Sequence, residues 1–140
     1  MQDDTMALKI VLKPHEKLII GGAVIENSGT KSEFLVENDV PLLRGKDIMG
    51  PNDVDSPCKR IYFTIQLMYV DEQNLIEHHK QYWDLVKDVV AAAPSRTSQL
   101  TEISEHIIAR RYYQALKVTK KLIEYEQEAI NNVRNSTPGL

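Results

Sequence analysis

The sequence predicts an α+β protein, in which a small antiparallel β-sheet of about five strands precedes a bundle of about four helices. Residues 1–50 contain short apolar runs separated by turn residues, a pattern typical of closely spaced strands. From Pro51 to residue 138 there is no glycine, and apolar residues recur at helical spacing. We therefore expect a β module over residues 1–50 and a helical module over residues 51–140.

Five apolar, partly β-branched runs predict the strands, at residues 8–13, 17–20, 23–25, 33–37 and 40–44. Pro14 ends the first run because proline has no N–H to donate to a neighbouring strand. Gly21 and Gly22 favour a tight turn after the second run, since glycine readily adopts positive φ. So small a sheet has exposed edges, and pairing with a second copy in a homodimer would cover them.

The helical module begins at Ser56 and Pro57, which resemble a helix start with serine as the cap and proline in the first turn. Asp71 could cap a second helix that ends near Pro94, and Ser98 a third. In the last segment apolar residues recur at steps of three and four, at Ala115, Val118, Leu122, Tyr125, Ala129 and Val133. This stripe could pack within the domain or against a partner helix, and the intramolecular use is favoured.

Composition and motifs argue against an enzyme, and no cofactor is expected. The formal net charge of −3 disfavours a broadly basic nucleic-acid-binding surface but allows a local basic patch. The single cysteine, Cys58, excludes an intramolecular disulfide and is expected to be a small buried side chain. His78 and His79 are adjacent and diverge by about 100° on a helix, so we expect solvated histidines and no metal site.

The sequence contains neither a long apolar run nor a start typical of a signal peptide, and these two observations bear on the cellular compartment. No run approaches the roughly 18 apolar residues of a membrane span. Residues 1–5 are polar and acidic, unlike the basic start and apolar core of a signal peptide. We therefore expect a protein of the reducing cytoplasm with no membrane partner.

Basic residues gather in and beside the predicted strands, and the candidate RNA-binding residues are Arg44, Lys13, Lys9 and Lys46. A sheet edge that carries lysine and arginine can hold phosphates and meet unpaired bases. The alternative is that these residues only keep the sheet edges from aggregating. Composition by itself favours this alternative.

Several blocks of sequence resemble the FlbT family of flagellin-synthesis regulators. The first is LKIVLKPHEKLIIGGAVI at residues 8–25. Later blocks are FLVEN at 34–38, LLRGKDIM at 42–49, PCKRIYFTIQLM at 57–68, YYQALK at 112–117 and LIEYE at 122–126. The blocks follow one another in order and span nearly the whole chain, so together they are specific.

This resemblance implies a role in flagellum biogenesis. Members of the family associate with the 5′ untranslated region of flagellin mRNA, and they lower its stability or translation in some bacteria and promote flagellin production in others. The resemblance also implies partners, namely a flagellin mRNA leader and either the FlaF-type regulator or flagellin itself.

The first half also resembles, more faintly, the carbon-storage regulator family of RNA-binding β proteins. The matching features are Glu16 followed by Ile20 and Gly21, and a final strand that carries Arg44. That family forms interleaved dimers in which the first and last strands pair between subunits. The resemblance implies that Arg44 is the main RNA contact and that Lys13 matches a basic residue closing the first strand. Leu12 stands where that family has a second arginine.

The expected function is post-transcriptional control of flagellin synthesis through direct binding of the mRNA leader. The alternative is a protein-binding adaptor or chaperone, in which the helical stripe grips the FlaF-type regulator or a flagellin helix and any effect on mRNA is indirect. Phosphate contacts weaken as salt rises, so titration of a flagellin leader across a salt series would separate the two.

Overall fold

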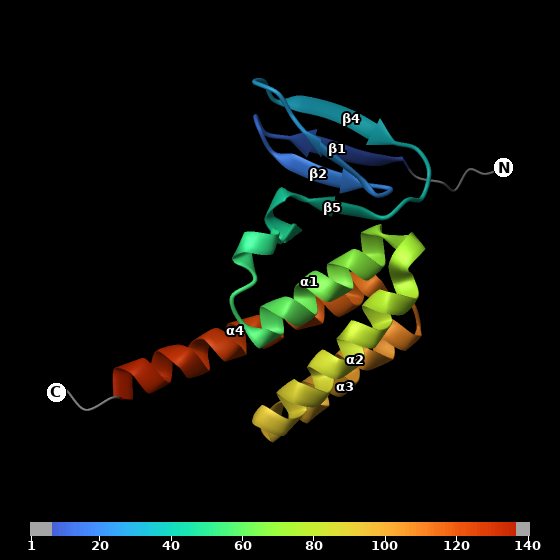
Figure 1. The fold of residues 1–140 in the computed structure, drawn as a ribbon. Helices are drawn as coiled ribbons and strands as arrows, with labels where there is room; N and C mark the ends of the chain where they lie inside the picture. Colours follow the sequence, from blue (N-terminus) through green and yellow to red (C-terminus); the bar gives the residue numbers. More distant parts are fainter. Residues whose placement is uncertain (1–6, 137–140) are drawn as a thin grey trace. The chain divides into compact units, whose positions relative to one another are not determined.

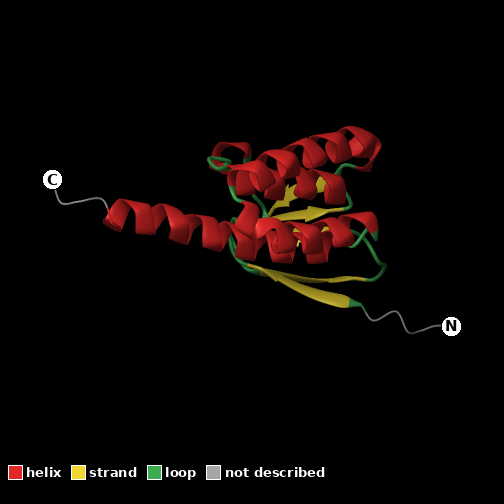
Figure 2. Cartoon of the chain, turned by 90° about the horizontal axis from the view of Figure 1, so that it is seen from below, coloured by secondary structure: helices red, strands yellow, loops and turns green. Residues whose placement is uncertain are grey.

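The computed structural model describes residues 7–136, which form two compact units, one up to Ile48 and one from Met49 onward (Figure 1). The first unit holds the strands β1 (Leu8–Leu12), β2 (Lys17–Ile20), β3 (Ala23–Glu26), β4 (Ser32–Val36) and β5 (Leu42–Arg44). The second holds the helices α1 (Pro57–Val70), α2 (Leu75–Ala92), α3 (Thr97–Ile108) and α4 (Tyr112–Ser136). Short 3-10 turns η1 (Gly45–Asp47), η2 (Pro51–Asp53), η3 (Glu72–Asn74) and η4 (Pro94–Arg96) connect or precede these elements. The α+β class and the order of strands before helices are confirmed (Figure 2).

The five strands form two small antiparallel sheets, where the sequence suggested one. β1 pairs with β4, with Ile10 opposite Phe34, and the other sheet has the order β3–β2–β5. The first and last strands therefore both find their partners within one chain. The interleaved dimer implied by the carbon-storage regulator resemblance remains a prediction.

A small apolar core stabilises the β unit. Ile10, Leu12 and Leu18 are buried at its centre, and partly buried side chains pack against them: Ile20, Phe34, Val36 and Leu42. The core draws on both sheets because alternate residues of a strand point to one face. Lys9 and Lys13 consequently belong to the opposite, outer face of the β1 segment, where both are exposed.

Two turns with positive φ fix the ends of β2. Gly21 and Gly22 have φ of 57° and 86°, so the predicted tight turn between β2 and β3 is confirmed. Before β2, the N–H of Glu16 donates to the carbonyl of Lys13, and His15 has a φ of 65°. Asn27 joins this turn to the next, because its Nδ2 donates to the carbonyl oxygens of Lys13 and Thr30, at 2.8 Å each.

The start of α1 is capped twice. Ser56 Oγ accepts from the N–H of Lys59, so the predicted serine cap is confirmed. The Glu126 carboxylate of α4 accepts from the Ser56 hydroxyl at 2.5 Å and from the N–H of Cys58 at 3.2 Å. A carboxylate at this end of a helix also complements the partial positive charge of its N–H groups. Cys58 is buried, as expected.

The helical core is formed by one face of each helix, and its most deeply buried side chains are Ile61, Ile65, Met68, Tyr82, Leu100, Ile103, Ile107 and Leu122. α4 packs on α1 and α3, and α2 packs on α1. The predicted stripe of α4 is buried at Ala115 and Leu122 but exposed at Ala129. The C-terminal part of α4 thus runs on beyond the other helices (Figures 1 and 2).

Three expectations for the helical unit need correction. α2 begins at Leu75 because the η3 turn follows Asp71, and α3 begins at Thr97, one residue before the expected cap Ser98. Solvated histidines were also expected on α2, but His78 is buried and its Nε2 lies 3.0 Å from Asp71 Oδ2. His79 bonds to the Tyr112 hydroxyl at 3.1 Å.

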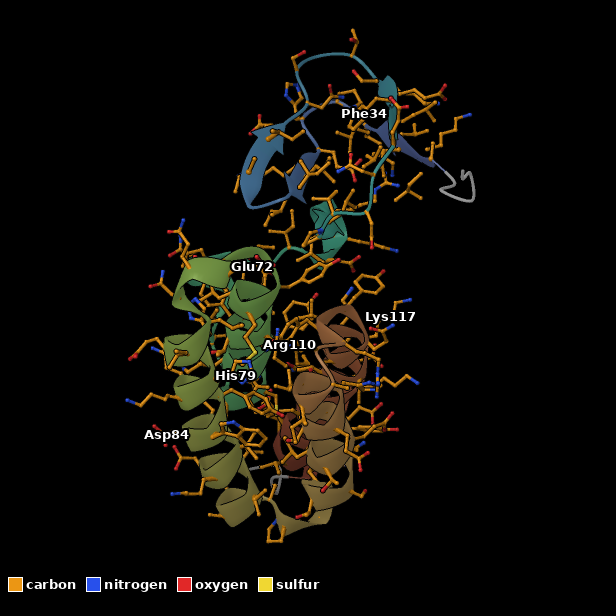
Figure 3. All side chains as sticks on the ribbon, turned by 90° about the vertical axis from the view of Figure 1, so that its right-hand side faces the viewer. Phe34, Glu72, His79, Asp84, Arg110 and Lys117 are labelled. Carbon is orange, nitrogen blue, oxygen red and sulfur yellow. The ribbon has the colours of Figure 1, made fainter. Side chains whose placement is uncertain are left out.

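The His79 side chain is partly buried, and Figure 3 labels it and Arg110, whose charge acts on it. Burial lowers the pKa of His79, and the charges of Arg110 and His78 lower it further. The neutral imidazole is therefore the form that this site favours.

The two isoleucines of α3 offer a matched test of the helical core, because Ile103 is 0% exposed and Ile108 is 72% exposed. Ile103→Ala should lower the free energy of unfolding by about 2–5 kcal/mol, since it leaves a cavity that the packed helices cannot close. Ile108→Ala should change it by less than about 0.5 kcal/mol. Guanidinium titrations followed by circular dichroism measure both values, and equal losses would contradict this packing.

Burial raises the pKa of the Cys58 thiol to about 12, and the nearby Glu126 carboxylate adds to the effect. The folded protein should therefore react with a thiol-specific reagent at pH 8 roughly 100-fold or more slowly than the denatured chain. The unfolded thiol ionises near pH 9, so this group lowers stability progressively as pH rises from about 9 to about 12. Rapid labelling of the folded protein would show that Cys58 is accessible.

Candidate functional site

The four predicted RNA-binding residues all lie in the β unit, in or just after strands β1 and β5. Lys9 lies within β1, Lys13 directly follows β1, and Arg44 ends β5. Lys46 lies in the η1 turn, two residues after Arg44. The structure brings the backbone of Lys13 close to the side chain of Arg44, because the Lys13 N–H and the Arg44 guanidinium both contact Glu16.

Arg44 is held by two groups of the same unit. Its Nη2 donates to the backbone carbonyl oxygen of Val11 and lies 3.5 Å from Glu16 Oε2. The side chain remains partly exposed. Arg44 therefore fastens β5 to β1 as well as carrying a positive charge at the surface.

Glu16 is the acidic centre of this cluster, with a side chain only 19% exposed. Its Oε1 accepts the backbone N–H of Lys13 at 2.9 Å. This hydrogen bond is the main cause that lowers the pKa of Glu16, and the charge of Arg44 contributes. The carboxylate consequently stays ionised at neutral pH and offsets the charge of Arg44.

Gly45 makes room for this carboxylate. A Cβ at position 45 would come within 3.0 Å of Glu16 Cγ, closer than side chains normally approach. Glycine at this position therefore lets Glu16 lie against the backbone beside Arg44.

Lys9 is also paired. Its Nζ lies 3.2 Å from Glu33 Oε2 on the neighbouring strand β4, and both side chains are well exposed. An exposed pair of this kind is weak and is screened by salt, so a phosphate can compete with Glu33 for the ammonium group.

Lys13 and Lys46 differ from the other two basic residues. Both side chains are exposed, and within residues 7–136 neither forms an ion pair with a carboxylate. The charge of Lys13 helps to lower the pKa of Glu16, but a ligand can reach either lysine without breaking an ion pair of the described residues. We call the four residues Lys9, Lys13, Arg44 and Lys46 the basic patch, and the carboxylates of Glu16 and Glu33 reduce its net charge.

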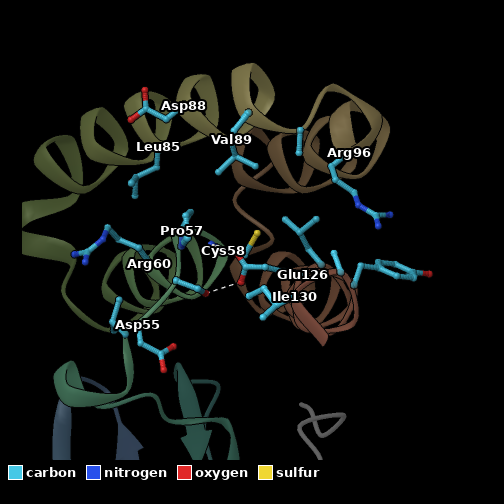
Figure 4. Close-up of a pocket in the computed structure, with 17 residues that line it drawn as sticks. Asp55, Pro57, Cys58, Arg60, Leu85, Asp88, Val89, Arg96, Glu126 and Ile130 are labelled. Atoms are coloured by element: carbon cyan, nitrogen blue, oxygen red, sulfur yellow. Dashed lines mark hydrogen bonds between the residues drawn. The ribbon is translucent and has the colours of Figure 1, made fainter. Parts of the chain in front are cut away.

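A second surface feature lies in the helical unit, where α1, α2, η4 and α4 enclose a groove of about 770 Å³ (Figure 4). Apolar side chains form much of its lining, including Cys58, Leu85, Val89, Leu122, Tyr125 and Ile130. Arg96 and Glu126 add charge, and the Arg96 guanidinium lies 4.7 Å from the centre of the Tyr125 ring. A groove of this size and character suits apolar side chains of another protein segment.

Sequence reasoning missed two parts of these surfaces. Glu16 was matched to a family motif, but its neutralising contact with Arg44 depends on β5 returning beside the turn before β2. The only local signal was the spacing of three residues between Lys13 and Glu16. The groove was missed because Leu85, Val89 and Tyr125 come together only once the helices pack.

Metal and membrane chemistry find no support in the part of the chain that the structure describes. Among residues 7–136 no group of three or more histidine, cysteine, aspartate or glutamate side chains could hold a metal ion. No helix in that range combines the length and apolar character that a membrane span requires.

The chain is similar to known flagellar proteins over most of its length. The family model "Flagellar protein FlbT" matches residues 8–130. A probable flagellum biosynthesis repressor protein FlbT 1 of Bradyrhizobium diazoefficiens is 40% identical over 124 residues, covering 88% of this chain and 84% of that protein. The flagellum biosynthesis repressor protein FlbT of Caulobacter vibrioides is 36% identical over 130 residues, covering 91% and 92%.

A probable flagellum biosynthesis repressor protein FlbT of Rhodopseudomonas palustris is 36% identical over 126 residues, which cover 90% of this chain and 99% of that protein. No solved structure matches the chain significantly. The family match covers both units, so it describes the whole arrangement of strands and helices. The chain belongs to the FlbT family of flagellar proteins, a family of flagellum biosynthesis repressors and not of enzymes.

Proposed function

We propose that this protein is a post-transcriptional regulator of flagellin synthesis that binds the 5′ untranslated region of flagellin mRNA and controls its stability or translation. The proposal rests on family membership together with one local observation. Lys13 and Lys46 are exposed and carry no ion pair among the described residues, beside a partly exposed Arg44. Three cations near one end of the small sheets suit the phosphates of a single strand.

The charge balance sets the expected strength of this contact. Glu33 pairs with Lys9 and Glu16 pairs with Arg44, so the basic patch offers only a small net positive charge to an RNA ligand. Affinity for arbitrary RNA should therefore be low at physiological salt, and a specific leader needs contacts to bases as well. Loop bases that are already unpaired are the part of a leader that offers such contacts.

A second candidate function is a protein-binding adaptor that acts through a FlaF-type regulator or flagellin, with only indirect effects on mRNA. The groove of the helical unit supports this candidate, because its lining is largely apolar and it borders the exposed end of α4. An amphipathic helix that presents apolar residues on one face would fit such a groove.

The double variant Lys13→Ala with Lys46→Ala tests the direct mechanism. It should weaken binding of a flagellin leader about three- to tenfold, because two phosphate contacts are lost. The slope of the logarithm of the binding constant against the logarithm of salt concentration should fall by about 0.7 for each contact. Gel-shift or fluorescence-anisotropy titrations at several salt concentrations provide both quantities.

The matched control for this experiment is Lys80→Ala, since Lys80 is an exposed lysine of α2 in the other unit. It should leave leader affinity and the salt slope unchanged. If wild-type protein does not bind the leader even at low salt, the adaptor candidate is favoured. Equal effects of the two lysine changes would indicate nonspecific attraction.

Glu16→Gln provides a test in the opposite direction. Glutamine can still accept the N–H of Lys13, but it no longer neutralises Arg44. We therefore expect leader binding to tighten about two- to fivefold and to depend more steeply on salt. Glu77→Gln on α2 removes one negative charge from an exposed position in the other unit and should have little effect. Unchanged affinity in the folded Glu16 variant would mean that Arg44 does not contact the RNA.

A further inference from the structure

The apolar stripe of α4 does not end where the helical bundle ends. Ala115 and Leu122 are buried against the other helices, whereas Tyr125, Ala129 and Ile130 further along the helix are exposed. These three residues also line the groove, so the exposed stretch is continuous with an apolar hollow. Such a continuous apolar surface usually marks a contact with another molecule.

The charges of α4 show which molecule fits. The exposed residues Lys117 and Lys121 precede the exposed residues Glu124 and Glu128, so a basic stretch is followed by an acidic one, and Arg134 lies beyond both in the last turn. Like charges fall four residues apart within each pair, a spacing that destabilises an isolated helix. Neither Lys121 nor Glu128 forms an ion pair within the described range.

A second copy of the same helix, running in the opposite direction, supplies opposite charges for Lys121 and Glu128. In an antiparallel pair the basic part of one α4 lies opposite the acidic part of the other, whereas a parallel pair would align like charges. Lys121, Tyr125 and Glu128 are spaced by four and three residues, so they follow one edge of the helix. A two-fold axis beside Tyr125 would place each Lys121 opposite the other copy's Glu128.

We infer that the protein forms a two-fold symmetric homodimer in which the α4 helices of two copies cross antiparallel near Tyr125, at the side of the groove that Tyr125 and Ala129 line. The contact is isologous, so every favourable pair occurs twice. Ala129 keeps the seam narrow next to the crossing point, and Tyr125 supplies the largest apolar area. This interface differs from pairing through the sheet edges, because it is formed by residues of α4 and requires no contact between strands.

Two tyrosines of α4 allow a matched test, because Tyr125 is 39% exposed and Tyr113 is 38% exposed but lies on a different face. Wild-type protein at micromolar concentration should show a mass of about twice the 16.0 kDa of the chain by light scattering. Tyr125→Glu should give the mass of a single chain, whereas Tyr113→Glu should remain dimeric. Circular dichroism checks that both variants are folded.

A charge exchange tests the direction and the register of the helices. Lys121→Glu alone, or Glu128→Lys alone, should weaken dimerisation about three- to tenfold, because like charges then face each other twice. The double variant should restore the wild-type dissociation constant to within about twofold. Sedimentation at several protein concentrations measures these constants.

Three results would overturn the inference. A single-chain mass for the wild-type protein at all concentrations would exclude the dimer and leave the groove to a different protein. Failure of the double charge exchange to restore dimerisation would exclude this register. Dissociation by Ile25→Glu on the edge strand β3, with Tyr125→Glu still dimeric, would place the interface at the sheet edge. None of these measurements involves RNA, so the inference and the proposed function can fail separately.

Discussion

The β unit depends on one partly buried cluster of contacts around the Glu16 carboxylate. One oxygen accepts the N–H of Lys13 at the end of β1, and the other faces Arg44 at the end of β5. Arg44 in turn donates to the carbonyl of Val11. These contacts join β1 of one sheet to β5 of the other, and they also offset part of the positive charge that the surface presents.

A unit of this size has little apolar surface with which to stabilise itself. Its centre consists of Ile10, Leu12 and Leu18 with four partly buried neighbours. Domains that bury so few side chains are marginally stable, so polar contacts such as those of Asn27 and Glu16 carry unusual weight. A residue that is a candidate for ligand binding can therefore also be structural, and Arg44 is an example because it links β5 to β1.

The sequence was informative where a signal is local. Pro14, the Gly21–Gly22 turn and the Ser56 cap act on their immediate neighbours, and the five strands and four helices were predicted in the right order, although α2 begins later than Asp71 suggested. The division into two sheets was not predictable in this way, because it depends on β4 returning to β1 across the chain. His78 was misjudged for the same reason, since its burial depends on how α2 packs.

The candidate site also depends on contacts between residues that are far apart in the sequence, which the sequence alone does not reveal. Counting charges identified the basic residues of the strands but could not tell which of them would be neutralised. The partner of Lys9 is on β4, and the partner of Arg44 lies 28 positions earlier in the chain, in the turn before β2. Only the pairing of strands decides these contacts, so a surface potential cannot be read from the order of residues alone.

A substitution at Gly45 can alter the contact between Glu16 and Arg44. A side chain at that position would meet Glu16 Cγ at 3.0 Å, so the Glu16 side chain would have to shift by a few tenths of an ångström. Replacement of one uncharged residue by another can therefore change how closely Glu16 approaches Arg44 while the formal charge of the protein stays the same. Homologous proteins could thus differ in their attraction to polyanions through a steric change that no comparison of charged residues would detect.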